Sequence, residues 1–257
     1  APESPIEDRP IVVGDWRPEN IDGRYRGRVS LADAFALSLN TAAVRLVQNV
    51  GPEAVVATAR RLGIAAPLPA VPSLALGTAE VSLLELTSAY LPFATGGIRP
   101  TVHAVREVKD DRGRILYRFA SSSRRVIDPS TATTMQQLLR AVVERGTGRA
   151  ARLPDRVVTG KTGTSQGFRD AWFVGAAGEL VVGVWVGNDD GRPMRGVTGG
   201  SLPAQIAREV LRAVPPTAPR GPALARVAPT PSEPPVPSQE NGLALILDWV
   251  SRTFGGR

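Results

Sequence analysis

Three β-rich segments follow one another between residues 157 and 186, and they constrain the fold more than any other feature of this chain. They cover residues 157–164, 171–177 and 180–186. Only Gly178-Glu179 separates the last two segments, and such a two-residue connection is typical of a type II′ hairpin. The amphipathic run 202–214 can cover one face of the resulting sheet as a helix. The sequence therefore predicts an antiparallel meander that packs against a helix.

The first hundred residues show the apolar spacing of helices instead. Residues 29–50 contain two helical runs, separated by Ser38-Leu39-Asn40. Asn40 is well placed as the N-cap of the second run, because a short polar side chain there can accept a hydrogen bond from the helix backbone. A proline at the start and a glycine after the end frame a further helix over residues 52–62.

Later segments show equally clear signals for individual elements. Ser82 and Glu85 form a capping-box pattern, which predicts a helix that ends at Gly96-Gly97. Residues 101–119 alternate around a turn and predict a β-hairpin. A helix is expected to begin at Asp128-Pro129 and to run to about residue 144.

The chain divides by composition into four parts. Residues 1–28 are rich in Pro, Gly, Asp and Arg and are expected to be an irregular lead-in to the main domain, residues 29–214. Residues 215–238 form a Pro-rich linker, with nine prolines between positions 215 and 237. Residues 239–257 form a C-terminal amphipathic tail.

Charge and cysteine usage exclude several function classes. The net charge is +7, but the arginines are scattered rather than grouped on one helix, so the sequence does not indicate nucleic-acid binding. Cysteine is absent, which excludes disulfides and thiolate metal sites. The longest apolar stretch, residues 171–187, is shorter than a membrane-spanning helix requires. His103 is interpreted as a strand residue, and Asp189-Asp190 as a turn rather than a metal pair, so we expect neither metal nor cofactor.

One short motif carries chemical information. Lys161-Thr162-Gly163-Thr164 ends a predicted strand, where a lysine flanked by hydroxyls can bind a substrate carboxylate. The strand backbone can pair with an extended peptide, and the glycine allows close approach. Ser38 and Asn40, taken alone, are interpreted as ordinary helix-capping residues.

A longer series of sequence blocks resembles the transpeptidase domain of class A penicillin-binding proteins, the bifunctional peptidoglycan synthases of the penicillin-binding protein 1A-like type. The resemblance runs from about residue 12 to residue 214. In chain order the blocks are Gly14-Asp15-Trp16-Arg17-Pro18-Glu19-Asn20, residues 34–44, Pro72-Ser73-Leu74-Ala75-Leu76-Gly77, Ala89-Tyr90 with Phe93-Ala94, residues 143–148, residues 160–164, residues 169–175, residues 184–189 and Thr198-Gly199-Gly200.

The resemblance implies an α/β (α+β) fold of the penicillin-binding protein/serine β-lactamase-like type. An antiparallel sheet flanked by helices and a helical subdomain are expected, with the N-terminal part of the fold incomplete. The implied reaction is acyl transfer, with Ser-x-x-Lys, Ser-x-Asn and Lys-Thr-Gly motifs converging on one cleft. Ser38 would join a proton-relay network, and Asn40 would bind a substrate amide. Lys161 would supply positive charge and hydrogen bonds near Ser38. Thr162, Gly163 and Thr164 would hold the substrate carboxylate and supply an oxyanion-hole N–H.

This sequence departs from the family pattern at the nucleophile. Its two lysines, Lys109 and Lys161, have Arg106 and Val158 three positions earlier, so no Ser-x-x-Lys is present. We expect the missing motif to lie before Ala1, and this chain alone to be inactive.

The partners implied by the resemblance are peptidoglycan stem peptides, β-lactam antibiotics, and an upstream glycosyltransferase domain with a membrane anchor. The implied location is the periplasmic or extracytoplasmic face of the bacterial inner membrane. Two alternatives stay open: a D,D-carboxypeptidase or β-lactamase, and a non-catalytic module of the same fold that binds stem peptides or proteins.

Overall fold

The computed structural model describes residues 1–215, and it divides them into two compact units. The larger unit contains residues 1–99 and 125–215, and the smaller unit contains residues 100–124. The predicted linker lies outside the described residues except for Pro215, and the predicted tail lies outside them entirely. The sequence did not predict residues 100–124 as a separate unit.

A three-stranded antiparallel sheet in the order β7-β8-β9 organises the larger unit. The strands are β7 (Thr159–Thr164), β8 (Asp170–Ala177) and β9 (Leu180–Gly187). Thr159 pairs with Ala176, and Ala177 pairs with Leu180 across the tight turn. The predicted meander is therefore confirmed, although its first strand begins two residues later than expected.

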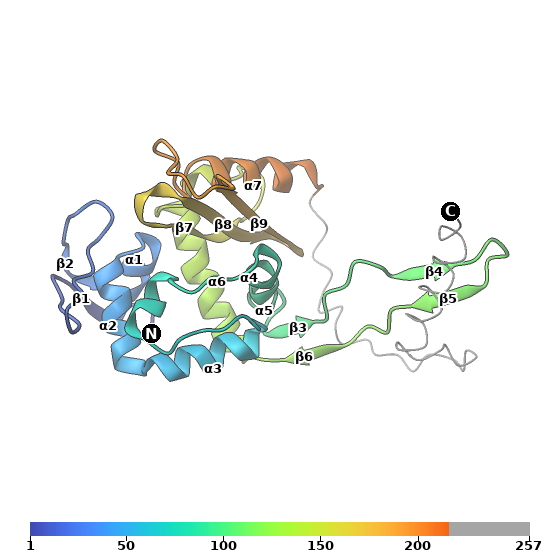
Figure 1. The fold of residues 1–257 in the computed structure, drawn as a ribbon, viewed down its shortest axis with the longest axis horizontal. Helices are drawn as coiled ribbons and strands as arrows, with labels where there is room; N and C mark the ends of the chain where they lie inside the picture. Colours follow the sequence, from blue (N-terminus) through green and yellow to red (C-terminus); the bar gives the residue numbers. More distant parts are fainter. Residues whose placement is uncertain (216–257) are drawn as a thin grey trace. The chain divides into compact units, whose positions relative to one another are not determined.

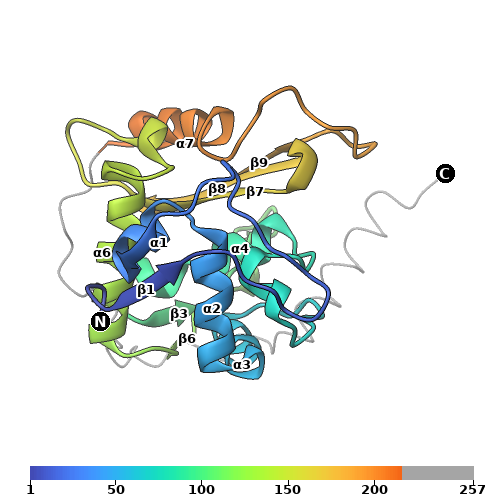
Figure 2. The same ribbon diagram turned by 90° about the vertical axis from the view of Figure 1, so that its left-hand side faces the viewer.

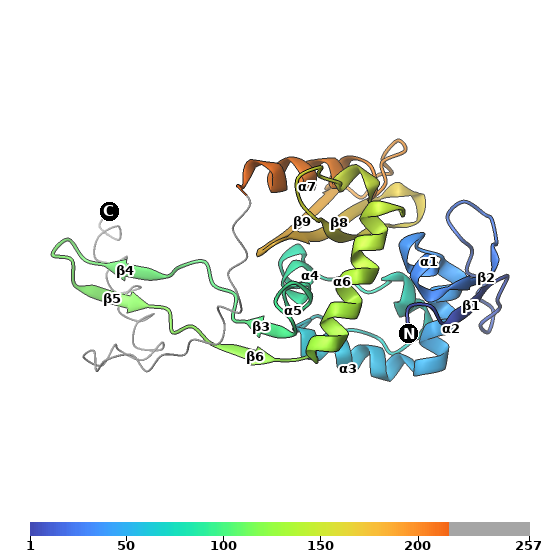
Figure 3. The same cartoon turned by 180° about the vertical axis from the view of Figure 1, so that it is seen from behind.

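Helices cover both faces of this sheet. Figures 1 and 3 show α7 (Leu202–Ala213) on one face, and α4 (Leu83–Ala89) with α6 (Pro129–Glu144) on the other. The core between α7 and the sheet centres on Phe173 and Leu211, whose exposed fractions are 0% and 1%. The predicted sheet flanked by helices and the helix over residues 129–144 are thus confirmed.

The helices of the first hundred residues follow their local signals closely. They are α1 (Leu31–Ala36), α2 (Asn40–Val50), α3 (Pro52–Leu62), η1 (Pro72–Leu76), α4 and α5 (Leu91–Ala94). Helix α3 has its predicted bounds and ends at Gly63 in the left-handed conformation. The Ser82–Glu85 capping box is present, but the helix that it opens ends at Ala89. A separate turn of helix follows, with Pro92 near its start, because proline cannot donate the hydrogen bond that a continuous helix requires.

The N-terminal segment is more ordered than its composition predicted. Strand β1 (Pro5–Asp8) pairs antiparallel with β2 (Gly27–Ser30), with Ile6 opposite Val29. Figure 2 shows β1 in front of α2, and the two elements are in contact. Residues 5–8 and 27–28 were therefore wrongly included in an irregular lead-in of residues 1–28, whereas residues 9–26 contain no regular helix or strand.

The smaller unit contains the predicted hairpin, formed by β4 (Glu107–Lys109) and β5 (Ile115–Arg118). Asp110 closes its turn by accepting hydrogen bonds from the backbone N–H groups of Arg112 and Arg114. His103 lies outside these strands, contrary to its interpretation as a strand residue, and its ring stacks on Phe119 at 3.8 Å.

The other described elements are short. They are the paired strands β3 (Ile98–Pro100) and β6 (Ser123–Arg125), and the 3-10 turns η2 (Arg149–Ala151) and η3 (Gln166–Phe168). Among residues 1–215, no helix combines the length and apolar character needed to cross a membrane.

Candidate functional site

Ser38 lies at the sharp corner between α1 and α2. Its φ angle is +55°, in the left-handed region that non-glycine residues rarely adopt. The corner is held by backbone hydrogen bonds from Ser38 N to Phe35 O, 3.2 Å, and from Leu39 N to Ala34 O, 2.9 Å. Such a conformation costs on the order of 1–2 kcal/mol, so the surrounding contacts must impose it.

Lys161 extends from β7 to this corner. Its Nζ lies 2.7 Å from Ser38 Oγ and 3.0 Å from the backbone oxygen of Thr162. The Phe35 ring lies beneath the amine, with its centroid 5.7 Å from Nζ. Loss of hydration in this half-buried position lowers the pKa of Lys161 from 10.5 to about 8. The amine can therefore exchange a proton with a neighbouring hydroxyl near neutral pH.

The two threonines that flank Gly163 have different partners. Thr162 Oγ1 lies 2.6 Å from Thr147 Oγ1, so these hydroxyls share a hydrogen bond. Thr164 Oγ1 accepts a hydrogen bond of 3.0 Å from the backbone N–H of Gly199. That contact occupies a lone pair of Thr164 Oγ1 and leaves its hydroxyl hydrogen for another acceptor.

The loop after α6 joins the helical part of the site to the sheet. Thr147 donates its backbone N–H to Ala36 O, 3.1 Å away, while its side chain contacts Thr162. A Cβ atom on Gly146 would lie 2.1 Å from Ala36 O, so only glycine allows this close approach. One loop thereby fixes both the end of α1, next to Ser38, and the strand that carries Lys161.

Asn40 is at the corner too, but it does not have the predicted capping role. Leu39 is the N-cap of α2 and provides no side-chain cap, whereas Asn40 is the first helical residue. The Asn40 side chain donates to Glu19 O, 2.7 Å away, and its backbone N–H donates to Asn20 Oδ1, 2.8 Å away. The prediction was wrong because a side chain 20 positions earlier takes over the capping.

The structure adds functional candidates that sequence reasoning did not assign. Asn20, Gly146, Thr147 and Gly199 contact the corner or β7 directly. All four lie in the sequence blocks that carry the family resemblance, but no local spacing relates them to Ser38 or Lys161.

The remaining polar candidates do not form a second site. Asp190 accepts from Arg192 N and Arg192 Nε within a turn, which agrees with the interpretation of Asp189-Asp190. Across residues 1–215, no group of three or more acidic, histidine or cysteine side chains could hold a metal ion.

The chain is similar to known proteins over most of its length. A family model described as the penicillin binding protein transpeptidase domain matches residues 2–212. The chain is 42% identical over 175 residues to penicillin-binding protein 1A of Aquifex aeolicus, which covers 68% of this chain and 24% of that protein. It is 32% identical over 216 residues to penicillin-binding protein 1B of Haemophilus influenzae, covering 81% and 28%. The chain thus spans about a quarter of the length of these curated relatives.

Solved structures show a similar likeness. The crystal structure of penicillin-binding protein 1A from Haemophilus influenzae matches with a TM-score of 0.78 and 25% identity, over 91% of this chain and 41% of that chain. The PonA1 protein from Mycobacterium tuberculosis, in complex with penicillin V, matches with a TM-score of 0.77 and 26% identity, over 91% and 69%.

Proposed function

Because the chain belongs to the penicillin-binding protein transpeptidase domain family, we propose that it supplies two motifs of a D,D-transpeptidase active site. The enzyme that contains it would cross-link peptidoglycan stem peptides by acyl transfer. The 2.7 Å contact between Lys161 Nζ and Ser38 Oγ carries this proposal. The two residues are 123 positions apart, and the fold joins a lysine of strand β7 to the corner before α2 as an amine–hydroxyl pair.

The proposed roles follow from the hydrogen-bonding capacity of each group. Lys161 and Ser38 relay a proton to and from the reacting centre, because the lowered pKa of the amine makes both of its protonation states accessible. Asn40 uses one Nδ2 hydrogen for Glu19 O, which leaves its second Nδ2 hydrogen and Oδ1 for a substrate amide.

The substrate carboxylate is assigned to the end of β7. The Thr164 hydroxyl accepts from Gly199, so its own hydrogen is available to a carboxylate, and Thr162 provides a second hydroxyl. Gly163 keeps the strand free of a side chain between them. The backbone N–H of Thr164 is proposed as one oxyanion-hole donor.

We further propose that the nucleophilic serine is supplied by residues outside these 257, since no serine here precedes a lysine by three positions. By itself the chain is then not acylated by penicillin. The location proposed for the whole protein is the extracytoplasmic face of the bacterial inner membrane. A glycosyltransferase domain and a membrane anchor are proposed for its remaining part.

The absence of Ser-x-x-Lys from the chain also favours a second candidate, a non-catalytic module of the same fold. Strand β7 lies at an edge of the three-stranded sheet, where an extended stem peptide could add as a further strand. Such a module would bind a peptide ending in D-alanyl-D-alanine without forming a covalent bond.

Covalent labelling by a fluorescent penicillin separates these candidates. The 257-residue chain and the full protein that contains it are compared, and we expect labelling of the full protein only. A Lys161→Ala change in the full protein should abolish labelling. The matched control is Lys109→Ala, because Lys109 is the other lysine of this chain and pairs with Glu107 in the smaller unit. Labelling of the short chain would contradict the proposal that the nucleophile lies outside it. Labelling of neither protein would contradict the transpeptidase assignment and favour the non-catalytic module.

A further inference from the structure

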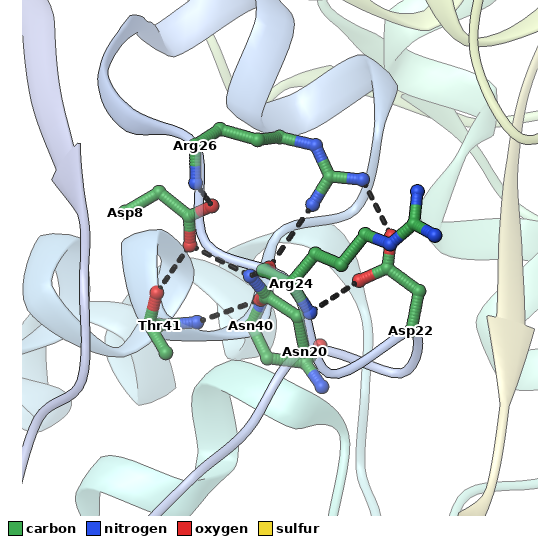
Figure 4. A network of polar contacts seen from close by, with 7 residues as sticks. All are labelled: Asp8, Asn20, Asp22, Arg24, Arg26, Asn40 and Thr41. Atoms are coloured by element: carbon green, nitrogen blue, oxygen red, sulfur yellow. Dashed lines mark hydrogen bonds and ion pairs between the residues drawn. The ribbon is translucent and has the colours of Figure 1, made fainter.

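A buried polar network lies beneath the corner that carries Ser38. Figure 4 shows Asp8 joined by hydrogen bonds to Asn20 and Thr41. The exposed fractions of Asp8, Asn20 and Thr41 are 0%, 5% and 0%. The Asp8 carboxylate accepts from Asn20 Nδ2 at 2.8 Å, from Thr41 Oγ1 at 2.5 Å and from the backbone N–H of Arg26 at 2.8 Å. Burying a carboxylate is costly unless it is hydrogen-bonded in this way, so the arrangement tolerates few alternatives.

Asn20 caps α2 from outside the helix. Its Oδ1 accepts from the backbone N–H of Asn40 at 2.8 Å, and the N–H of Thr41 lies 3.4 Å away. These N–H groups belong to the first helical turn, where no intrahelical acceptor exists, and the N-cap residue Leu39 supplies none.

The orientation of the Asn20 amide is fixed by its other end. Nδ2 donates to Asp8 Oδ1 and to Arg24 O, at 2.8 Å and 2.7 Å. A flipped amide would place Nδ2 against the N–H groups of α2 and Oδ1 against two acceptors. Asp8 therefore anchors Asn20 with its acceptor toward the start of α2.

The start of α2 determines where Ser38 and Asn40 lie. Ser38 precedes the helix by two residues and keeps an unfavourable φ angle, while Leu39 between them is buried. The Asn40 side chain is bound to Glu19 O, next to Asn20. A shift of this corner would change the 2.7 Å contact between Ser38 and Lys161.

We propose that Asn20, anchored by Asp8, is a positioning residue that holds the Ser38-x-Asn40 corner in the geometry needed for acylation. This inference rests on the proposed function, since it concerns the rate of the same reaction. Asn20 acts through the α2 backbone, whereas Ser38, Asn40 and Lys161 are the groups proposed to meet the substrate or the reacting atoms.

The test uses the full protein that contains this segment. Acylation by a fluorescent penicillin is measured over a range of concentrations, which separates the maximal rate constant from the half-saturating concentration. We expect Asn20→Ala to lower the maximal rate constant on the order of 10- to 100-fold, because small misplacements of catalytic groups have effects of this size. The half-saturating concentration should change much less.

Two further comparisons separate positioning from a general loss of stability. Ser82→Ala is the matched control, because it removes a side-chain cap from α4, another helix of the same unit. It should leave the maximal rate constant unchanged. Hydrogen exchange at the Asn40 and Thr41 amides should accelerate in Asn20→Ala and not in Ser82→Ala.

Exchanging the residues at positions 8 and 20 tests whether acylation can be restored. Asn20→Asp places two carboxylates side by side, and Asp8→Asn places two amides there, so each alone should slow acylation. The double variant Asp8→Asn with Asn20→Asp restores one donor–acceptor pair and keeps an acceptor toward Asn40 N. It should acylate faster than either single variant.

The outcomes distinguish failure of the proposed function from failure of this inference alone. If the protein without substitutions is not acylated, the proposed function is overturned and this inference with it. If that protein is acylated normally and Asn20→Ala has the same maximal rate constant, the inference alone is overturned. If Asn20→Ala does not fold, the reciprocal exchange decides, and a double variant no faster than its single variants overturns the inference.

Discussion

The Lys161 amine provides the sharpest quantitative prediction. Its pKa falls from 10.5 to about 8 because the folded protein removes water from the amine. A shift of this size corresponds to about 3 kcal/mol in favour of the neutral form, as an upper limit for a half-buried group. At pH 7 about one amine in ten is then neutral, compared with fewer than about one in a thousand for an ordinary lysine.

Nuclear magnetic resonance of the chain labelled with ¹³C-lysine measures this titration directly. The sequence contains only Lys109 and Lys161, so Lys109→Arg leaves a single lysine signal and conserves the positive charge beside Glu107. We expect a midpoint close to pH 8 under folding conditions and a return toward the ordinary value in urea. A folded-state midpoint at pH 10 or above would refute the argument that this site is poorly hydrated.

The same shift predicts how stability depends on pH. Between pH 8 and 10.5 the unfolded chain binds the Lys161 proton more tightly than the folded chain, so the free energy of unfolding rises with pH through this window. Burial raises the pKa of Tyr90 to about 12, which makes stability fall again as the pH passes 10. Urea denaturation should therefore show a maximum near pH 10, and Lys161→Met should remove the rise below it.

Substitutions at Gly199, Gly160 and Ser38 test the close contacts of the site and its supporting sheet. A Cβ on Gly199 would lie 2.2 Å from Trp172 O, so Gly199→Ala should displace the loop beside Thr164 and reduce penicillin labelling of the full protein. A Cβ on Gly160 would lie 2.4 Å from the buried Phe173 ring. Gly160→Ala should therefore lower the free energy of unfolding by about 1–3 kcal/mol, and Phe173→Leu should partly compensate in a double-mutant cycle. Ser38→Gly should raise the free energy of unfolding by about 1 kcal/mol, because glycine adopts a positive φ without strain, yet penicillin labelling should be lost. A destabilised Ser38→Gly would contradict this account of the corner.

The sequence pattern predicted a helix or hairpin correctly where neighbouring residues alone determine that element. Pro52 and Gly63 framed α3 at its observed bounds, and Ser82 with Glu85 marked the start of α4. The two-residue link at Gly178-Glu179 gave the hairpin of β8 and β9. The helix predicted from Ser82 to Gly96-Gly97 is two helices, because Pro92 lacks the backbone N–H that a continuous helix would need there.

The sequence predicted individual residues of the site but not all of the contacts between them. Lys161, Ser38 and Asn40 were selected by motif and family resemblance, and the structure places Lys161 against Ser38. The role of Asn40 as a helix cap was wrong, because local spacing gives no information about a competing side chain at position 20. The segment that holds Asn20 was interpreted as an irregular lead-in, although its buried hydrogen bonds fix the start of α2.

The sequence by itself determined which short elements form, and that lysine is available for site chemistry at only two positions. The tertiary structure decided that one of these amines loses water beside Ser38, and that Thr147, Gly199 and Asn20 hold the surrounding backbone. Helix caps and strand alternation depend on neighbours a few positions away, whereas desolvation and long-range hydrogen bonds depend on which distant segments pack together. Those contacts exist only once the chain has folded.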